Sequence, residues 1–215
     1  SNFSKNIIPS IQPTHATSDM YWAQERLGPD RIKGAYSYST LLKNAGMVAL
    51  GTDFPVEGVN PMHTFYAAVA RKDLNQYPDN GFRIQEALTR EQALKGMTIW
   101  AAYANFEDTF KGSIEVGKFA DFTVLEKDIM KIPQDSIPGV KTLATFIDGV
   151  KSARAAALQW FPLAVSRIQA SALAFVPSPN ANSSYASTAI FTPYRSSRAA
   201  DTASTAPRPR PSSLT

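Results

Sequence analysis

The sequence predicts an α/β fold that changes, near residue 111, into a run of short strands. Residues 47–51 (MVALG) are apolar throughout, which is typical of a strand covered on both faces, as in a parallel sheet. Helix signals lie on both sides of this segment and indicate an alternation of helices and strands. Beyond residue 111, short strand-like segments and turn residues replace that alternation.

The first elements are predicted from apolar runs and stop signals. Residues 7–13 (IIPSIQP) are short and apolar and predict the end of a buried strand. Residues 36–45 predict a helix with Leu41 and Leu42 in the core, and Gly46 is the expected stop after it. This helix leads into the apolar strand of residues 47–51.

A second helix is predicted after that strand. Asn60 is a favourable N-cap, and Pro61 suits the first helical position. The apolar stripe of this helix consists of Met62, Phe65, Tyr66 and Val69.

The next elements are a long helix and two strands. Residues 89–92 (TREQ) form a capping box, which predicts the start of that helix. Residues 119–126 (FADFTVLE) and 143–147 (LATFI) predict strands, and Asp148-Gly149 is a hairpin-turn dipeptide. The expected buried face of the long helix consists of Leu94, Met97, Ala101 and Ala104.

Composition divides the chain near residue 151. The net charge is +4, but residues 1–151 hold 16 basic and 17 acidic residues, whereas residues 152–215 hold six Arg and one Asp. The basic character therefore belongs to the tail and does not indicate a specific nucleic-acid partner. Residues 152–175 could form short helices, and the Ser/Pro/Arg-rich stretch from Pro177 is predicted to be disordered. No apolar run reaches 18 residues, so no membrane span is expected.

Two residues stand where strands are predicted to end, and each has a structural alternative. Asp53 follows the apolar run directly, where a carboxylate could bind a metal or take a proton from water, or could simply cap a turn set by Pro55. His15 could be a metal ligand, a general base or a loop residue that hydrogen-bonds locally beside Asp19. His63 is expected at a surface or boundary position. The absence of cysteine excludes thiolate chemistry, and no HxH, HExxH, Walker A, GxGxxG or GxSxG motif occurs.

Several segments together resemble the C-terminal part of a metal-dependent amidohydrolase. They are SIQPTHATSDMYWAQERLG, GTDFPVE, NPMHTFYAAVARKD, LTREQALKGMTIWAAYANFE and KGSIEVGKFADFTVLEKDIM, in one order over about residues 7–150. GSIEVGKFADFTVL is similar to a superfamily-wide signature, which argues against a barrel enzyme of another class. QPTHATSDM with GTDFPVE is similar to amidohydrolase family 3, the branch of YtcJ-like hydrolases and N-substituted formamide deformylases.

The resemblance implies a fold and two site residues. Residues 1–110 would be the last strand–helix units of a (β/α)8 barrel, residues 111–151 part of a small β-sandwich, and residues 152–215 a tail outside the family pattern. Asp53 would end barrel strand 8, bind a divalent metal, expected to be zinc, and move the proton of the attacking water. His15 would follow strand 7 near the substrate pocket.

The same resemblance implies hydrolysis of amide-like, non-peptide carbon–nitrogen bonds in a small molecule by metal-activated water. The family's other metal ligands lie upstream of the matching segments, so this chain is expected to be a C-terminal fragment that is inactive alone. The alternative is a non-enzymatic truncated or fusion product whose basic tail contacts anionic partners weakly. The substrate, the oligomeric state and the compartment, cytoplasmic or exported, stay open.

Overall fold

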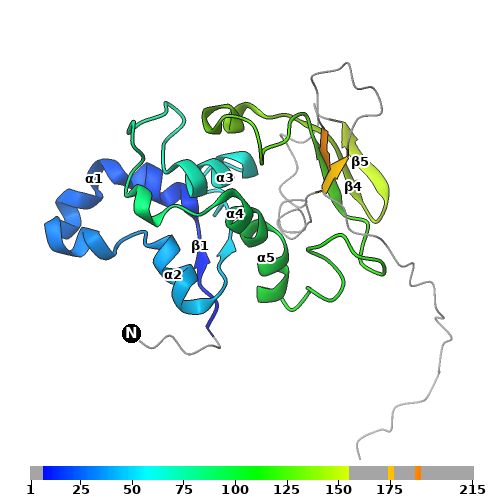
Figure 1. Ribbon diagram of the computed structural model, residues 1–215, viewed down its shortest axis with the longest axis horizontal. Coiled ribbons are helices and arrows are strands. Elements are labelled where there is room, and N and C mark those ends of the chain that lie inside the picture. The colour runs from blue at the N-terminus through cyan, green and yellow to red at the C-terminus, as the bar shows by residue number, and fades with distance from the viewer. Residues whose placement is uncertain (1–6, 155–173, 177–186, 190–215) are drawn as a thin grey trace, which may run out of the picture.

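The computed structural model describes residues 7–154, 174–176 and 187–189. Helices gather around a short two-stranded sheet at one end of the molecule, and a five-stranded sheet lies at the other end (Figure 1). The described helices are α1 (Pro13–Arg31), α2 (Tyr38–Ala45), α3 (Pro61–Ala70), α4 (Arg90–Met97) and α5 (Ile99–Ala104), with 3-10 turns η1 (Ile32–Gly34), η2 (Ile84–Glu86) and η3 (Gln134–Gly139). None of them is long and apolar enough to cross a membrane.

The two-stranded sheet is parallel and pairs β1 (Ser10–Ile11) with β2 (Ala49–Leu50). Ile11 lies opposite Leu50 in the register, and the Gly51 amide extends the pairing to the Ile11 carbonyl at 3.0 Å. Helices α1 and α2, with η1 between them, form the connection from β1 to β2, and Gly46 ends α2 in the left-handed conformation that glycine adopts without a Cβ clash (φ +83°). The predicted strands at both positions are confirmed, although each is short.

The five-stranded sheet is antiparallel and has the order β5-β4-β3-β7-β6. Asp148 and Gly149 both have positive φ and connect β4 to β5 as a two-residue hairpin, as their dipeptide predicts. The strands are β3 (Phe122–Leu125), β4 (Thr142–Ile147), β5 (Val150–Arg154), β6 (Ala174–Val176) and β7 (Ser187–Ala189).

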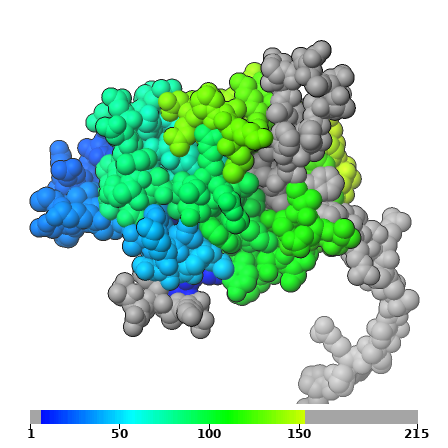
Figure 2. Space-filling model, in the orientation of Figure 1, coloured from blue at the N-terminus to red at the C-terminus, as the bar shows by residue number. Residues whose placement is uncertain are grey.

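The hydrophobic core lies mainly between α3, the two-stranded sheet and η3. Every residue of α3 after His63 is buried, so the predicted stripe is part of a helix surrounded on nearly all sides. The core continues to Leu125 of β3 and Ile137 of η3, which joins the helical end to the larger sheet. Figure 2 shows the two ends as one continuous body.

Helix α1 has no counterpart among the predicted elements, because its apolar residues follow no strong helical period; Pro13 occupies its first turn. Two expectations about the predicted long helix need correction. The predicted long helix is two helices, because Thr98 leaves helical geometry (φ −125°, ψ −98°). Its fully buried residues are Ala93, Gly96 and Ala102, whereas the four predicted ones are only partly buried.

The tail also differs from its prediction where the structure describes it. Strand β5 continues the pairing to Arg154, past the boundary drawn at residue 151. Strand β6 overlaps the end of the segment that could form short helices, and β7 lies in the segment predicted to be disordered. Pairing of β7 with β3 explains this, because the edge of β3 not used by β4 offers free backbone groups. The rest of the predicted tail lies outside the described residues.

Candidate functional site

The two candidate residues meet at the carboxyl ends of the two parallel strands. His15 lies in the first turn of α1, which begins directly after β1, and Asp53 lies in the loop after β2. Because neighbouring parallel strands end at the same edge, the segments that follow them lie side by side. The His15 Nε2 atom lies 3.2 Å from Asp53 Oδ2. The predicted strand-end position of Asp53 is therefore confirmed.

Local backbone geometry aims each side chain. The His15 amide donates to the carbonyl of Gln12, the N-cap of α1, at 3.1 Å. Asp53 has a left-handed backbone (φ +57°), and its carbonyl accepts from the Val56 amide at 2.8 Å. A carboxylate on a left-handed residue between a strand and a tight turn is a strained arrangement of the kind that recurs at functional sites.

The contact between the two side chains is a close approach and not an aligned hydrogen bond. Within the described residues, the buried Nε2 of His15 has no hydrogen-bond partner of good geometry. The Asp53 side chain is 45% exposed and the His15 side chain 28% exposed. One carboxylate oxygen of Asp53 thus lies beside the His15 imidazole, while the carboxylate stays accessible to a ligand or to water.

The His15–Asp53 contact is the first of three between α1 and carboxylates of the following loops. Ser18 donates to Glu57 at 2.6 Å, and Tyr21 donates to Asp73. His15, Ser18 and Tyr21 are three residues apart, so they share one face of α1. Periodicity alone does not reveal this polar row, because its partners come from other elements.

Asp19 and His63 do not join the pair. The Asp19 carboxylate accepts from the Tyr36 hydroxyl at 2.7 Å, and burial followed by this bond raises the pKa of Tyr36. His63 lies in the first turn of α3 with Nε2 3.2 Å from the side-chain amide of Asn60, and burial lowers its pKa. The boundary position expected for His63 is confirmed.

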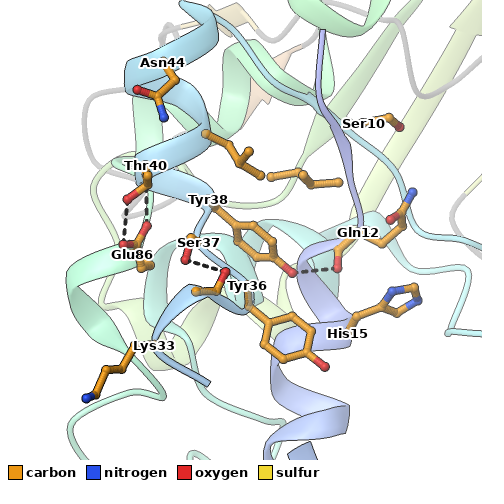
Figure 3. A pocket seen from close by; sticks show the side chains of 13 residues that line it. Ser10, Gln12, His15, Lys33, Tyr36, Ser37, Tyr38, Thr40, Asn44 and Glu86 are labelled. Carbon is orange, nitrogen blue, oxygen red and sulfur yellow. Dashed lines mark hydrogen bonds between the residues drawn. The ribbon is translucent and has the colours of Figure 1, made fainter. Parts of the chain in front are cut away.

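A hollow of 560 Å³ opens next to His15, between the end of β1 and α2 (Figure 3). His15 lines this hollow, whereas Asp53 does not. On the far wall, Glu86 accepts from the amide of Thr40 at 2.9 Å and from its hydroxyl at 2.8 Å. Other lining residues are Ser10, Ile11, Gln12, Lys33, Gly34, Tyr36, Ser37, Tyr38, Leu41 and Asn44.

The described residues do not by themselves fit a metal ion. No group of three or more His, Asp or Glu side chains in this part of the chain converges with metal-ligand geometry. His15 and Asp53 offer two donors, whereas a catalytic zinc site has about three protein ligands and a water. What the pair can do directly is accept a proton or a hydrogen bond at an accessible carboxylate.

Comparisons with known proteins add the family context. The sequence model described as "Amidohydrolase family" matches residues 3–152. The chain is 33% identical over 145 residues to "Protein LONG AFTER FAR-RED 3" of Arabidopsis thaliana, covering 67% of this chain and 24% of that protein. It is 32% identical over 143 residues to "Putative amidohydrolase YtcJ" of Bacillus subtilis, covering 66% and 27%.

A third relative is named for an enzymatic activity. Over 103 residues the chain is 33% identical to "N-substituted formamide deformylase" of Arthrobacter pascens, covering 48% of this chain and 18% of that protein. The chain thus spans about a quarter or less of the length of these relatives. No solved structure matches it significantly.

Proposed function

Because the chain belongs to the amidohydrolase family, we propose that it supplies part of the site of a hydrolase that cleaves carbon–nitrogen bonds in small amide-like molecules. The observation that carries the proposal is the close approach of His15 and Asp53 at the ends of two adjacent parallel strands. Functional groups of parallel α/β folds collect at this edge, whereas buried strand residues contribute packing. The similarity to a formamide deformylase supports an amide-like carbon–nitrogen bond as the target.

In this proposal Asp53 is the catalytic carboxylate. Its accessible side chain can accept the proton that the attacking water loses as it adds to the substrate carbonyl. The tight turn that follows fixes the backbone of Asp53, because the amides of Val56 and Glu57 both donate to the Asp53 carbonyl. A carboxylate fixed in this way needs little reorganisation when the proton arrives.

His15 is the proposed substrate-binding residue. It lines the hollow beside β1 and also approaches Asp53, so it stands between the open volume and the carboxylate. A ring nitrogen in that place can hydrogen-bond the substrate amide and orient its carbonyl toward the water held by Asp53. The side chain of His63 has a different environment and is not part of this site.

A divalent metal, with zinc as the expected ion, belongs to the proposal for the whole protein only. When bound, such an ion polarises the carbonyl and lowers the pKa of its water. Asp53 would be one of its ligands, and the remaining donors would come from segments outside this sequence. The short span relative to known family members supports that division, and we therefore propose that the 215-residue chain alone is inactive.

The test is Asp53→Asn in the complete protein that carries this chain. An N-substituted formamide and an N-acetyl anilide serve as substrates, and release of the amine is measured. Loss of a general base lowers kcat about 10²- to 10⁴-fold. Glu57→Gln is the matched control, because Glu57 lies in the same loop and accepts from Ser18 but does not contact His15. Equal kcat for D53N and wild type would disprove the role of Asp53.

A further inference from the structure

Arg71 is a buried cation at the end of α3. Its side chain is 0% exposed, and Glu86, which pairs with Arg83 among the described residues, acts on Arg71 only through a weaker coulombic attraction. Burial lowers the pKa of its guanidinium to about 10. A charge placed in this environment is costly unless its hydrogen bonds stabilise something specific.

The guanidinium is bound by the loops that enclose it. Arg71 Nε donates to the Phe82 carbonyl at 2.9 Å, and Nη2 donates to the Tyr36 carbonyl at 3.1 Å. The guanidinium carbon lies 4.7 Å from the ring centroid of Tyr38 and 5.8 Å from that of Phe82. Arg71 thus fixes the start of α2 by a backbone bond and a cation–π contact at the same time.

Tyr38 connects Arg71 to the residues next to His15. Its hydroxyl donates to the Gln12 carbonyl at 3.2 Å, and the same carbonyl accepts from the His15 amide at 3.1 Å (Figure 3). Gln12 is the last residue between β1 and α1, so its orientation decides how the first turn of α1 leaves the strand. That turn aims the His15 ring at Asp53.

From these contacts we infer that Arg71 is a positioning residue for the His15–Asp53 pair, acting through the Tyr38 ring and its bond to Gln12. The inference rests on the proposed function only for its effect on catalysis. The effect of Arg71 on the position of the His15 ring follows from the contacts above and does not depend on the proposed function. It assigns a role to a buried cation that the proposed chemistry does not otherwise use.

The first test removes one atom. Tyr38→Phe keeps the ring beneath the guanidinium but deletes the hydroxyl that reaches Gln12. The readout is the ring ¹⁵N spectrum of histidine-labelled protein, in which the two histidines of the chain give two ring systems. We expect Y38F to move the His15 Nε2 signal toward its position in D53N and to leave His63 unchanged. Tyr66→Phe is the control, because it deletes another buried tyrosine hydroxyl, bound to Asp135 at 2.9 Å.

The second test removes the cation. Arg71→Met should move the His15 signal as Y38F does. Arg71→Lys should return the signal only part of the way to its wild-type position, because a lysine ammonium lacks the planar array of donors of a guanidinium. Arg90→Met is the matched structural control, since Arg90 also clamps two backbone carbonyls, those of Ile129 and Ile132, away from His15. If R71M does not fold, Y38F decides.

Two outcomes overturn the inference. One is an unchanged His15 signal in Y38F, and the other is an equal change in Y66F or R90M, which would reveal a general effect of destabilisation. The proposed function fails separately, if D53N retains full activity while Y38F still moves His15. In the complete enzyme, Y38F should lower kcat more than it changes KM, because positioning acts on the oriented complex.

Discussion

His15 and Asp53 come from two different strand ends, yet their side chains approach to 3.2 Å. The parallel register that sets Ile11 beside Leu50 produces this approach, because both residues follow their strands at the same edge. The pair separates the tasks proposed for the site. The imidazole faces the open hollow, and the carboxylate stays accessible beside it.

Substitution of His15 should affect substrate binding more than turnover. His15→Asn in the complete protein is expected to raise KM about 2- to 10-fold, which corresponds to the loss of one hydrogen bond of about 0.5–1.5 kcal/mol. The smaller effect on kcat follows from the intact Asp53. His63→Gln is the control, because its amide can still bond Asn60. Steady-state kinetics with a lower kcat and an unchanged KM for H15N would instead assign His15 to the chemical step.

Zinc titration of the 215-residue chain should reveal no tight site. His15 and Asp53 are two donors, and the sequence holds one further histidine and no cysteine. Catalytic zinc sites need about three ligands. Calorimetry should therefore show binding no stronger than that of an ordinary carboxylate, with the same isotherm for D53N. One stoichiometric submicromolar event that disappears in D53N would contradict this prediction.

Gly96→Ala tests the packing that supports β2. A Cβ at residue 96 would overlap Cδ1 of Leu50 and lie 3.1 Å from the Val48 carbonyl oxygen. Alanine favours a helix by about 1 kcal/mol over glycine, but overpacking a core costs about 1–3 kcal/mol. The backbone contact cannot relax easily, so we expect a net loss of about 1 kcal/mol in urea unfolding. Gly139→Ala is the control, since a methyl group at residue 139 would meet no atom within 4 Å. A more stable G96A would show that Leu50 moves aside freely.

Alkaline pH should destabilise the folded chain through its tyrosines. Burial raises the pKa of Tyr38 to about 12 and, together with bonds to carboxylates, raises those of Tyr36 and Tyr66. A raised folded pKa gives stability that is complete below the unfolded value near 10 and is lost as pH rises through the folded value. Arg71 has the opposite pH dependence, because its lowered folded pKa costs stability at lower pH, and this cost decreases as pH rises above about 10. Three tyrosines outweigh one arginine.

The measurement is the free energy of urea unfolding from pH 9 to pH 12, with tyrosinate absorbance followed in parallel. The free energy should fall across this range, and less steeply in Y66F than in wild type. A flat profile, or tyrosines that all ionise near pH 10 in the folded chain, would show that these hydroxyls are accessible to solvent.

The elements that the sequence predicts best are those whose signals are local. The Thr89 hydroxyl accepts from the Gln92 amide, and Gln92 returns a bond to the Thr89 amide, as the capping box predicts. The Asn60 side chain accepts from the Met62 amide, as an N-cap should. Each interaction spans two or three residues, so the residue types at those positions are sufficient to predict it.

Elements that depend on distant partners escape prediction from the sequence. Helix α1 has no strong apolar stripe, and one polar row of it contacts Asp53, Glu57 and Asp73 from other loops. The break at Thr98 likewise has a tertiary setting, since a Cβ on residue 112 would lie 3.0 Å from the Ile99 Cα and 3.3 Å from the Thr98 carbonyl oxygen. A helical period carries no information about such neighbours.

By itself the sequence determined the alternation of helices and strands, the helix caps, the Asp-Gly hairpin and the position of Asp53 just after a strand. Its similarity to the amidohydrolases rests on the same short segments. Only the tertiary structure decided that His15 faces Asp53 and that Arg71 reaches them through Tyr38. The reason is physical: caps and turns are fixed by contacts within a few residues, whereas the site is made by strand register and by a buried cation that joins segments far apart in the chain.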